Sequence, residues 1–371
     1  MVPKEYYGRL FTKEQLPVNY HPEALTLEGM IKVDKQLRCK RCYSWIEEDW
    51  QLPGGQYYCR ACIVFGRNQE GKELYYFPSK TSEIEFPVLK WFGELTPYQA
   101  KVSEKLLRTY QKQKDSLVHA VTGAGKTEMI YNIVAYVLEN KGHVAIASPR
   151  VDVCRELFLR MKRDFTCSIS LLHAESEPYD GSPLVIATTH QLLKFYQSFD
   201  LVIVDEVDAY PFVGNVMLNH AVEQAKTETG RFIYLTATST LSLEEQVRLG
   251  TLEKHHLARR FHGNPLVLPK LFWQGRLQKS LTRGKLPRPL LYQIKKQRKS
   301  KFPLLIFFPN IAIGEKFTSI LQKYLPDEKM AFVSSKSEKR STIVEKFRKK
   351  ELSILVTTTI LERGVTFPQV D

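Results

Sequence analysis

The stretch Ser116-Leu-Val-His-Ala-Val-Thr-Gly-Ala-Gly-Lys-Thr127 decides the fold of this chain. Its first six residues form a short, mostly apolar run that is typical of a buried strand, and apolar residues then recur at helical spacing up to Val137. A glycine-rich turn between a strand and a helix is the context of a P-loop, here with Ala120 where glycine is more usual. The sequence therefore predicts an α/β fold with a phosphate-binding loop.

The residues of this turn have predicted roles in binding ATP. The glycines allow backbone N–H groups to wrap the phosphates at the N-terminus of the helix, where the helix dipole favours an anion. Lys126 is expected to reach the terminal phosphates, and the Thr127 hydroxyl to ligate Mg²⁺. The predicted nucleotide-binding residues of the loop are Thr122, Gly123, Ala124, Gly125, Lys126 and Thr127.

The second half of the predicted site is Asp200-Leu-Val-Ile-Val-Asp-Glu-Val-Asp208, about eighty residues further along the chain. Its four apolar residues predict a buried parallel strand, and carboxylates follow at the carboxyl end, where open α/β sheets bind their ligands. Asp205 is predicted to hold Mg²⁺ and Glu206 to orient and polarise the attacking water. Alone, this Asp-Glu pair would indicate only a turn at a strand end. The runs His143–Ala147 and Pro183–Ala187 predict further strands of a doubly wound sheet.

Two Cys-x-x-Cys pairs with sixteen residues between them lie near the N-terminus. This spacing predicts a zinc ribbon over about residues 37–65, with two short strands around Pro53-Gly-Gly55. Six cysteines are too few for a disulfide scaffold in 371 residues. A catalytic zinc is not expected, because protein ligands fill all four positions. The predicted zinc ligands are Cys39, Cys42, Cys59 and Cys62.

Two roles for this zinc site stay open. It either staples a small domain whose core is too small to fold unaided, or also grips nucleic acid through Lys40, Arg41 and Arg60, which lie inside the two cysteine pairs. The remaining cysteines, Cys154 and Cys167, are predicted to be buried thiols.

The net charge of +14 is concentrated in the last hundred residues. Residues 269–371 contain 22 Lys or Arg and 8 Asp or Glu, and no acidic residue lies between Glu253 and Glu315. Such a segment suits a polyanion, because each basic residue near a phosphate releases condensed counterions, although a solvated linker is the alternative. The predicted contacts to nucleic acid here are Lys295, Lys296, Arg298 and Lys299. Phe272, Trp273 and Tyr292 are either stacking surfaces for bases or, more simply, core residues.

From about residue 95 onward, the motifs resemble the ordered set of the superfamily 2 helicases. Leu95-Thr-Pro-Tyr-Gln99 is similar to the upstream glutamine element, so Gln99 is expected to contact adenine. Thr236-Ala-Thr238 resembles the motif that couples hydrolysis to domain movement, and the resemblance assigns Asp208, Thr236 and Thr238 to this coupling. The family's backbone contacts to nucleic acid match Pro149, Arg150, Thr188 and Thr189.

The same resemblance extends to the C-terminal part. Residues 304–310 are similar to the opening strand of a second RecA-like domain, and residues 354–364 to its fifth motif, where Gly364 is expected to contact the nucleotide. The implied architecture is α/β, with RecA-like doubly wound parallel sheets in tandem behind an N-terminal four-cysteine zinc-binding domain. The expected domains are 1–94, 95–268, and 269–371, the last comprising a basic linker and the first part of the second RecA-like domain.

A narrower resemblance rests on the four-cysteine module, the Asp-Glu-Val-Asp box and the ending Glu-Arg-Gly-Val-Thr-Phe-Pro. Together these are similar to the ComFA late-competence ATPases. This implies an ATP-dependent single-stranded DNA translocase that drives uptake of transforming DNA, with ATP, Mg²⁺ and Zn²⁺ as cofactors. The implied partners are single-stranded DNA and other competence proteins, including the membrane DNA channel. Whether the chain also forms a homo-oligomer stays open.

Other expectations follow from this resemblance and from composition. The chain lacks an apolar run of about 18 residues and a signal peptide, so it is expected to be cytoplasmic, at the cytoplasmic face of the cell membrane, and not itself transmembrane. The family continues beyond the position of Asp371 to an arginine-finger motif, so this chain is expected to bind ATP better than it hydrolyses it. The alternatives are a strand-separating helicase that resembles PriA, in replication restart or repair, and a nucleotide-gated DNA-binding module without productive turnover.

Overall fold

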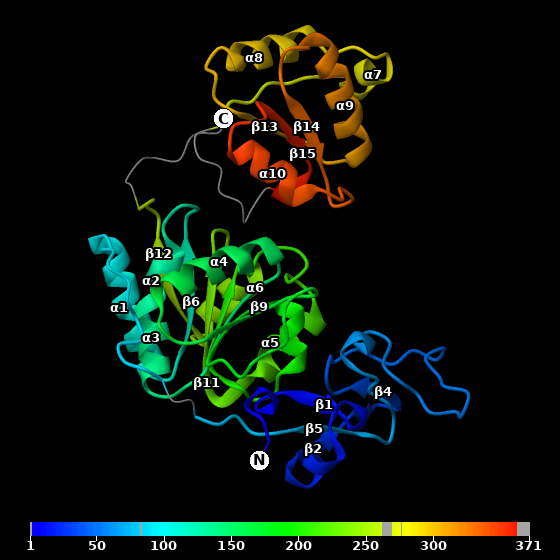
Figure 1. Cartoon of the computed structure of the whole chain (residues 1–371), viewed down its shortest axis with the longest axis vertical. Coiled ribbons are helices and arrows are strands. Elements are labelled where there is room, and N and C mark those ends of the chain that lie inside the picture. The colour runs from blue at the N-terminus through cyan, green and yellow to red at the C-terminus, as the bar shows by residue number, and fades with distance from the viewer. Residues whose placement is uncertain (1, 82–83, 262–268, 276, 362–371) are drawn as a thin grey trace. The chain divides into compact units, whose positions relative to one another are not determined.

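The structure is a computed structural model of the 371-residue chain. It describes all residues except 1, 82–83, 262–268, 276 and 362–371. The chain divides into two compact units, Met1–Leu266 and Val267–Asp371 (Figure 1). Gly364, a predicted nucleotide contact, lies outside the described residues.

The first unit is built on a seven-stranded sheet with strand order β12-β6-β11-β10-β7-β9-β8, in which neighbouring strands pair in parallel. Continuous apolar runs form these strands because helices cover both faces of a parallel sheet, so successive side chains on either face are buried. Every residue of β7 and β9 is buried. The strands are β6 (Asp115–Ala120), β7 (Val144–Ser148), β8 (Ile169–Leu172), β9 (Leu184–Thr188), β10 (Phe199–Asp205), β11 (Lys226–Thr236) and β12 (Leu252–Leu257).

Helices cover both faces of this sheet, as Figure 1 shows. Alternate strand residues point to opposite faces and supply two separate cores, one shared with α1, α3 and α4 and the other with α5 and α6. The predicted doubly wound parallel sheet is therefore confirmed. The helices are α1 (Pro97–Gln111), α2 (Lys126–Met129), α3 (Tyr131–Glu139), α4 (Val151–Asp164), α5 (Val216–Ala225) and α6 (Leu241–Arg248), with a short 3-10 helix η5 (Thr189–Lys194) after β9.

The N-terminal part of the first unit carries two small antiparallel sheets. One has the order β1-β5-β2, and the other is the hairpin β3-β4, which leads directly into the first cysteine pair. Around Pro53-Gly-Gly55 the structure shows only an isolated bridge between Gln51 and Tyr57 in place of the two predicted strands. The elements are β1 (Leu10–Thr12), β2 (Leu25–Glu28), β3 (Met30–Val33), β4 (Gln36–Cys39), β5 (Glu73–Tyr76), and 3-10 helices η1 (Lys4–Tyr6), η2 (Lys13–Gln15), η3 (Val18–Glu23) and η4 (Ile63–Phe65).

The second unit has a three-stranded parallel sheet with order β13-β15-β14. All four residues of β15 are buried, as expected for a central strand with side chains packed on both faces. The elements are α7 (Leu277–Thr282), α8 (Arg288–Arg298), β13 (Leu304–Phe307), α9 (Ile311–Tyr324), β14 (Met330–Val333), α10 (Arg340–Arg348), β15 (Ile354–Thr357) and a 3-10 helix η6 (Thr359–Leu361). Among the helices of the described residues, none has the length and apolar character needed to span a bilayer.

Candidate functional site

The phosphate loop connects β6 to α2 at the carboxyl edge of the sheet. Gly123 and Gly125 have φ angles of 78° and 72°, a backbone conformation that residues with a side chain rarely adopt. A Cβ on Gly125 would lie 2.3 Å from the Gln99 amide nitrogen, so the position also lacks room for a side chain. Lys126 opens the helix, and its Nζ lies 3.4 Å from the Ala120 carbonyl oxygen. This curled backbone, with a lysine at its end, fits the phosphates of a nucleotide.

Asp205 and Glu206 lie at the carboxyl end of β10, next to this loop. Burial raises the pKa of Asp205, and the charge of Lys126 opposes that shift. Glu206 has a φ angle of 55°, and its backbone N–H donates to Asp205 Oδ1 over 2.9 Å. The Asp205 carboxylate and the Thr127 hydroxyl are the oxygen ligands that Mg²⁺ prefers, so this edge of the sheet offers the right donors for the ion.

The three proposed coupling residues are linked by hydrogen bonds. The Thr236 hydroxyl donates to Asp208 Oδ1 over 2.8 Å, and the Thr238 hydroxyl donates to Asp208 Oδ2. Thr236 ends β11, the strand between β6 and β10. The structure therefore connects the loop that follows the Asp-Glu pair to the end of the neighbouring strand.

Gln99 has a structural role that the sequence analysis missed. It closes a capping box with Thr96 at the start of α1, where its Oε1 accepts a hydrogen bond from Thr96 N over 2.9 Å. Its Nε2 donates to the Ala124 carbonyl over 2.8 Å. Gln99 thus ties the start of α1 to the phosphate loop.

A cavity of about 240 Å³ adjoins the phosphate loop, and several of its lining residues were not predicted. The Arg259 guanidinium lies 5.2 Å from the centre of the Tyr98 ring, and Phe261 N donates to the Gly123 carbonyl over 3.1 Å. This segment follows β12, whose carboxyl end lies beside that of β6. Strand β12 was not predicted from the sequence, and the signal that could have drawn attention to this segment is the adjacent pair Arg259-Arg260. The lining residues are Thr96, Pro97, Tyr98, Gln99, Leu257, Arg259, Arg260 and Phe261.

The four predicted zinc ligands come together in one buried cluster. All four cysteines are fully buried, and their Sγ atoms lie within 4.8 Å of one another. The Sγ···Sγ distances between Cys39 and Cys62, Cys42 and Cys59, and Cys62 and Cys59 are 3.7, 3.5 and 3.6 Å. Tetrahedral zinc with Zn–S bonds of about 2.3 Å separates its sulfurs by about 3.8 Å, whereas a disulfide holds them about 2.0 Å apart. The cluster therefore fits zinc and four thiolates.

Arg41 lies beside this cluster, away from solvent. Its side chain is fully buried, and its guanidinium donates to Cys62 Sγ over 3.2 and 3.3 Å and to the carbonyls of Cys62, Phe65 and Gly66. A buried guanidinium needs compensating negative charge, which zinc-bound thiolates supply. This corrects the idea that Arg41 grips nucleic acid, because its donors are all turned inward.

The four-cysteine segment packs on the seven-stranded sheet through α5. Tyr43, directly after the first cysteine pair, stacks on His220 with ring centres 4.7 Å apart, and His220 Nε2 lies 2.9 Å from the Lys40 carbonyl oxygen. The cysteines belong to the same buried cluster as the α5 side of the sheet. The four-cysteine cluster and the seven-stranded sheet thus share one hydrophobic core.

The structure changes the set of proposed nucleic-acid contacts on the first unit. Pro149 and Arg150 are half-buried at the end of β7, and Arg150 Nε lies 3.5 Å from Glu206 Oε2. The side chains of Thr188 and Thr189 are buried, because β9 is the second strand from the sheet edge and η5 packs over its end. We therefore leave Thr188 and Thr189 out of the proposed side-chain contacts.

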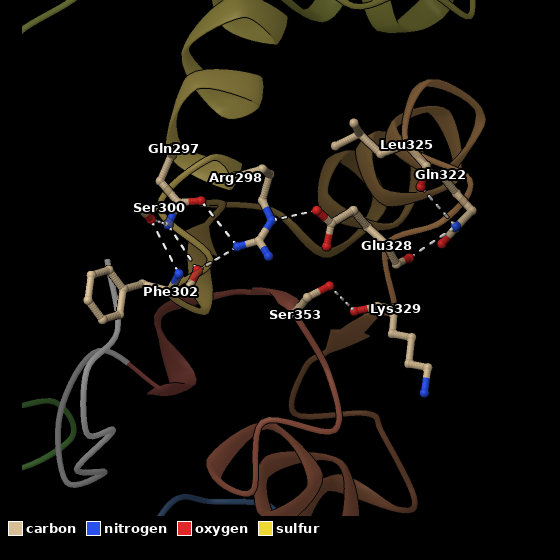
Figure 2. Close-up of polar contacts among 9 residues, drawn as sticks. All are labelled: Gln297, Arg298, Ser300, Phe302, Gln322, Leu325, Glu328, Lys329 and Ser353. Carbon is tan, nitrogen blue, oxygen red and sulfur yellow. Dashed lines mark hydrogen bonds and ion pairs between the residues drawn. The ribbon is translucent and has the colours of Figure 1, made fainter.

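The predicted nucleic-acid contacts at α8 of the second unit also differ in their exposure. Lys295, Lys296 and Lys299 are exposed, whereas the Arg298 Nε donates to Glu328 Oε1 over 2.8 Å and its Nη1 donates to the Phe302 carbonyl. Figure 2 shows this guanidinium held between the carboxylate and the carbonyl. Because its side chain is only 11% exposed, Arg298 stabilises the unit and is removed from the proposed contacts.

The aromatic residues of the basic segment lie at the surface. Phe272, Trp273 and Tyr292 are exposed, with Trp273 97% exposed. The core alternative is therefore wrong for all three. They are available to stack on bases.

Comparison with known proteins defines the class. The DEAD/DEAH box helicase family matches residues 96–246, and the helicase conserved C-terminal domain matches residues 286–371. Together with the phosphate loop and the Asp-Glu pair, these matches make the chain an ATP-dependent enzyme of the helicase type. They also imply that it uses a nucleotide with Mg²⁺ and binds nucleic acid.

The particular family follows from two relatives. The chain is 55% identical over 370 residues to competence protein ComFA of Streptococcus pneumoniae, covering 99% of this chain and 85% of that protein. It is 34% identical over 371 residues to ComFA of Bacillus subtilis, covering 97% and 79%. The chain belongs to the ComFA family.

Solved structures share the fold at low sequence identity. S. cerevisiae Dbp5 bound to RNA and ADP BeF3 aligns with a TM-score of 0.53 and 13% identity, over 75% of this chain and 77% of that one. Mycobacterium smegmatis helicase Lhr bound to ssDNA and AMP-PNP aligns with a TM-score of 0.54 and 18% identity, over 76% and 42%. These likenesses support the RecA-like fold class.

Proposed function

We propose that this chain uses ATP hydrolysis to move along single-stranded DNA, and that it thereby drives the uptake of transforming DNA at the cytoplasmic face of the cell membrane. The observation that carries the proposal is the meeting of the predicted nucleotide-binding and coupling residues at the carboxyl edge of the first sheet. There Lys126, Asp205 and Glu206 adjoin one another, and Asp208 is hydrogen-bonded to Thr236 and Thr238.

In this proposal each residue of the edge has one task. The amides of the phosphate loop and Lys126 bind the phosphates, while Asp205 and Thr127 supply oxygen ligands for Mg²⁺, which neutralises charge on the phosphates when bound. Glu206 orients the attacking water. Asp208 transmits the state of this site to the end of β11, because both threonine hydroxyls donate to its carboxylate.

The proposed DNA contacts carry no sequence information. Lys295 and Lys296 on α8 and Lys299 directly after it are exposed cations, and exposed Trp273 offers a stacking face to any base. A preference for a single strand is proposed because stacking needs unpaired bases. The names of the two ComFA relatives support the role in competence. The zinc site is proposed to stabilise the N-terminal part and its docking on α5.

ATP hydrolysis by the full-length protein, measured with single-stranded DNA, duplex DNA or RNA, tests the substrate. Single-stranded DNA is expected to stimulate hydrolysis most. Two results would contradict the translocase proposal: preferential stimulation by RNA, or strand separation of forked duplexes as the main activity. Either result would favour a strand-separating helicase instead.

Replacing the catalytic carboxylate tests whether turnover matters. Glu206→Gln is expected to abolish hydrolysis and transformation while ATP and DNA binding persist, because the amide cannot polarise water as the carboxylate does. If cells that carry Glu206→Gln still took up DNA, the chain would be a nucleotide-gated binding module without productive turnover.

A further inference from the structure

Arg150 and Glu206 form an ion pair that joins two sites with different proposed tasks. Arg150 is the N-cap residue of α4, two residues after β7 ends at Ser148, and Glu206 directly follows β10. These strands are parallel neighbours, paired from Leu201 with Val144 to Val204 with Ala147, so their carboxyl ends meet. Arg150 Nε lies 3.5 Å from Glu206 Oε2.

The pair is sheltered rather than fully solvated. The side chains of Arg150 and Glu206 are 23% and 17% exposed. Attraction between charges is screened less at such a place than between fully exposed side chains. The contact is therefore strong enough to influence where the Glu206 carboxylate lies, and open enough for a competing anion to reach Arg150.

The Glu206 backbone forms a tight turn directly after β10. Its φ angle of 55° is uncommon for a residue with a side chain, and such outliers gather at functional turns. The turn is fixed on both sides, because Glu206 N donates to Asp205 Oδ1 and Ala209 N donates to the Glu206 carbonyl over 2.8 Å. The Glu206 backbone is thus constrained, so a change in the contacts of this residue would be a movement of its side chain.

Arg150 lies at the N-terminus of α4, a position that favours an anion. As the N-cap of the fourteen-residue helix α4, it adds its charge to the positive end of the helix dipole, and its side chain makes no capping hydrogen bond. The Glu206 carboxylate is one anion that meets this demand. A phosphate of a nucleic-acid backbone would meet it too, because guanidinium groups bind phosphate well.

We propose that Arg150 is a positioning residue that engages Glu206 until a backbone phosphate of bound DNA takes its place, and that release of Glu206 then raises the rate of ATP hydrolysis. This inference rests on the proposed function, since it requires that the chain binds DNA. It makes one ion pair the switch between the idle and the stimulated motor. Arg150 touches neither the nucleotide nor the attacking water in this scheme, and it acts through Glu206.

The test compares Arg150→Ala, Arg150→Lys and a matched control, Arg155→Ala, in the full-length protein. Arg155 is an exposed arginine on the same helix. For each variant, kcat and KM for ATP are measured with and without saturating single-stranded DNA, and DNA affinity is measured by fluorescence anisotropy. Melting temperatures show whether each variant is folded.

Arg150→Ala is expected to raise the DNA-independent kcat about fivefold, the factor that corresponds to losing a partly exposed ion pair. The KM for ATP stays near the wild-type value, and the ratio of stimulated to unstimulated kcat falls toward one. Arg150→Lys keeps the charge and is expected to lie between Arg150→Ala and the wild type. Arg155→Ala is expected to behave as the wild type in all these measurements.

Two results overturn the inference. If folded Arg150→Ala keeps the wild-type unstimulated kcat, the ion pair does not restrain Glu206. If unstimulated and stimulated kcat fall together in both Arg150 variants, the pair is a permanent support for the active site. Failure of the proposed function looks different, because the wild-type protein itself would then show no stimulation by DNA.

Discussion

The buried arginine beside the four-cysteine cluster allows a prediction that distinguishes two arginines by their surroundings. Arg41 and Arg60 each lie inside a cysteine pair, yet Arg41 is fully buried and Arg60 is 44% exposed. Arg60 pairs with Asp49 at 3.1 Å, whereas Arg41 donates to Cys62 Sγ and to three carbonyls. We predict that Arg41→Ala weakens zinc binding and that Arg60→Ala leaves it nearly unchanged.

The expected size follows from the contacts. A residue that hydrogen-bonds a metal ligand is worth about 10- to 100-fold in metal affinity. This range corresponds to about 1.4–2.7 kcal/mol, similar to one charge-assisted hydrogen bond of about 1.5–3 kcal/mol. The exposed ion pair of Arg60 and Asp49 is screened by solvent, and Arg60 donates to oxygen atoms of Tyr58 and Asp49 rather than to sulfur. Its loss is therefore expected to change zinc affinity less than about fivefold.

The assay is competition for zinc with a coloured chelator of known affinity, on proteins loaded with one equivalent of the ion. Arg41→Lys is a second variant that keeps the charge but loses the planar set of donors, and we expect it to lie between Arg41→Ala and the wild type. The reasoning fails if Arg41→Ala holds zinc as tightly as the wild type, or if Arg60→Ala loses as much affinity as Arg41→Ala.

Three further predictions concern the motor. Replacing Lys295, Lys296 and Lys299 by glutamate is expected to flatten the salt dependence of DNA binding, because fewer counterions are released. A Lys323→Glu control on α9 is expected to leave the salt dependence unchanged. An unchanged slope for the triple variant would exclude these lysines from the DNA-binding surface. Arg298→Ala is expected to lower the free energy of unfolding of the second unit by about 1–3 kcal/mol in urea titrations, and no loss would mean that its ion pair with Glu328 is dispensable. Arg259→Ala is expected to raise the KM for ATP about threefold to tenfold with a smaller change in kcat, because the adenine base is expected to stack beside Arg259 and Tyr98. An unaltered KM would place the base elsewhere.

Much of the fold was predictable because its signals are local. The strand, glycine turn and lysine at residues 116–127 specify a phosphate loop by short-range geometry, and the apolar runs predict strands that are buried on both faces. The details within single helices were less accurate. The helix expected to continue to Val137 is interrupted at Ile130, between α2 and α3.

Several proposed site residues were misjudged because their surroundings come from distant parts of the chain. Thr188 and Thr189 follow a motif pattern, yet the packing of η5 buries them. Arg298 belongs to a run of cations, but Glu328 is thirty residues away in sequence and its carboxylate meets the guanidinium. Phe272 and Trp273 are apolar, which favours the core, but their segment lies at the surface.

The sequence by itself determined the class of fold, the phosphate loop, the Asp-Glu pair and the four cysteines, because each depends on residue types at fixed short spacings. Only the tertiary structure decided what the charged side chains of these motifs contact. Arg41 turns inward to sulfur, and Arg150 meets Glu206, because neighbouring strands and loops bring together residues that are far apart along the chain. Burial and partner of a charge are set by such long-range packing, which no short motif encodes.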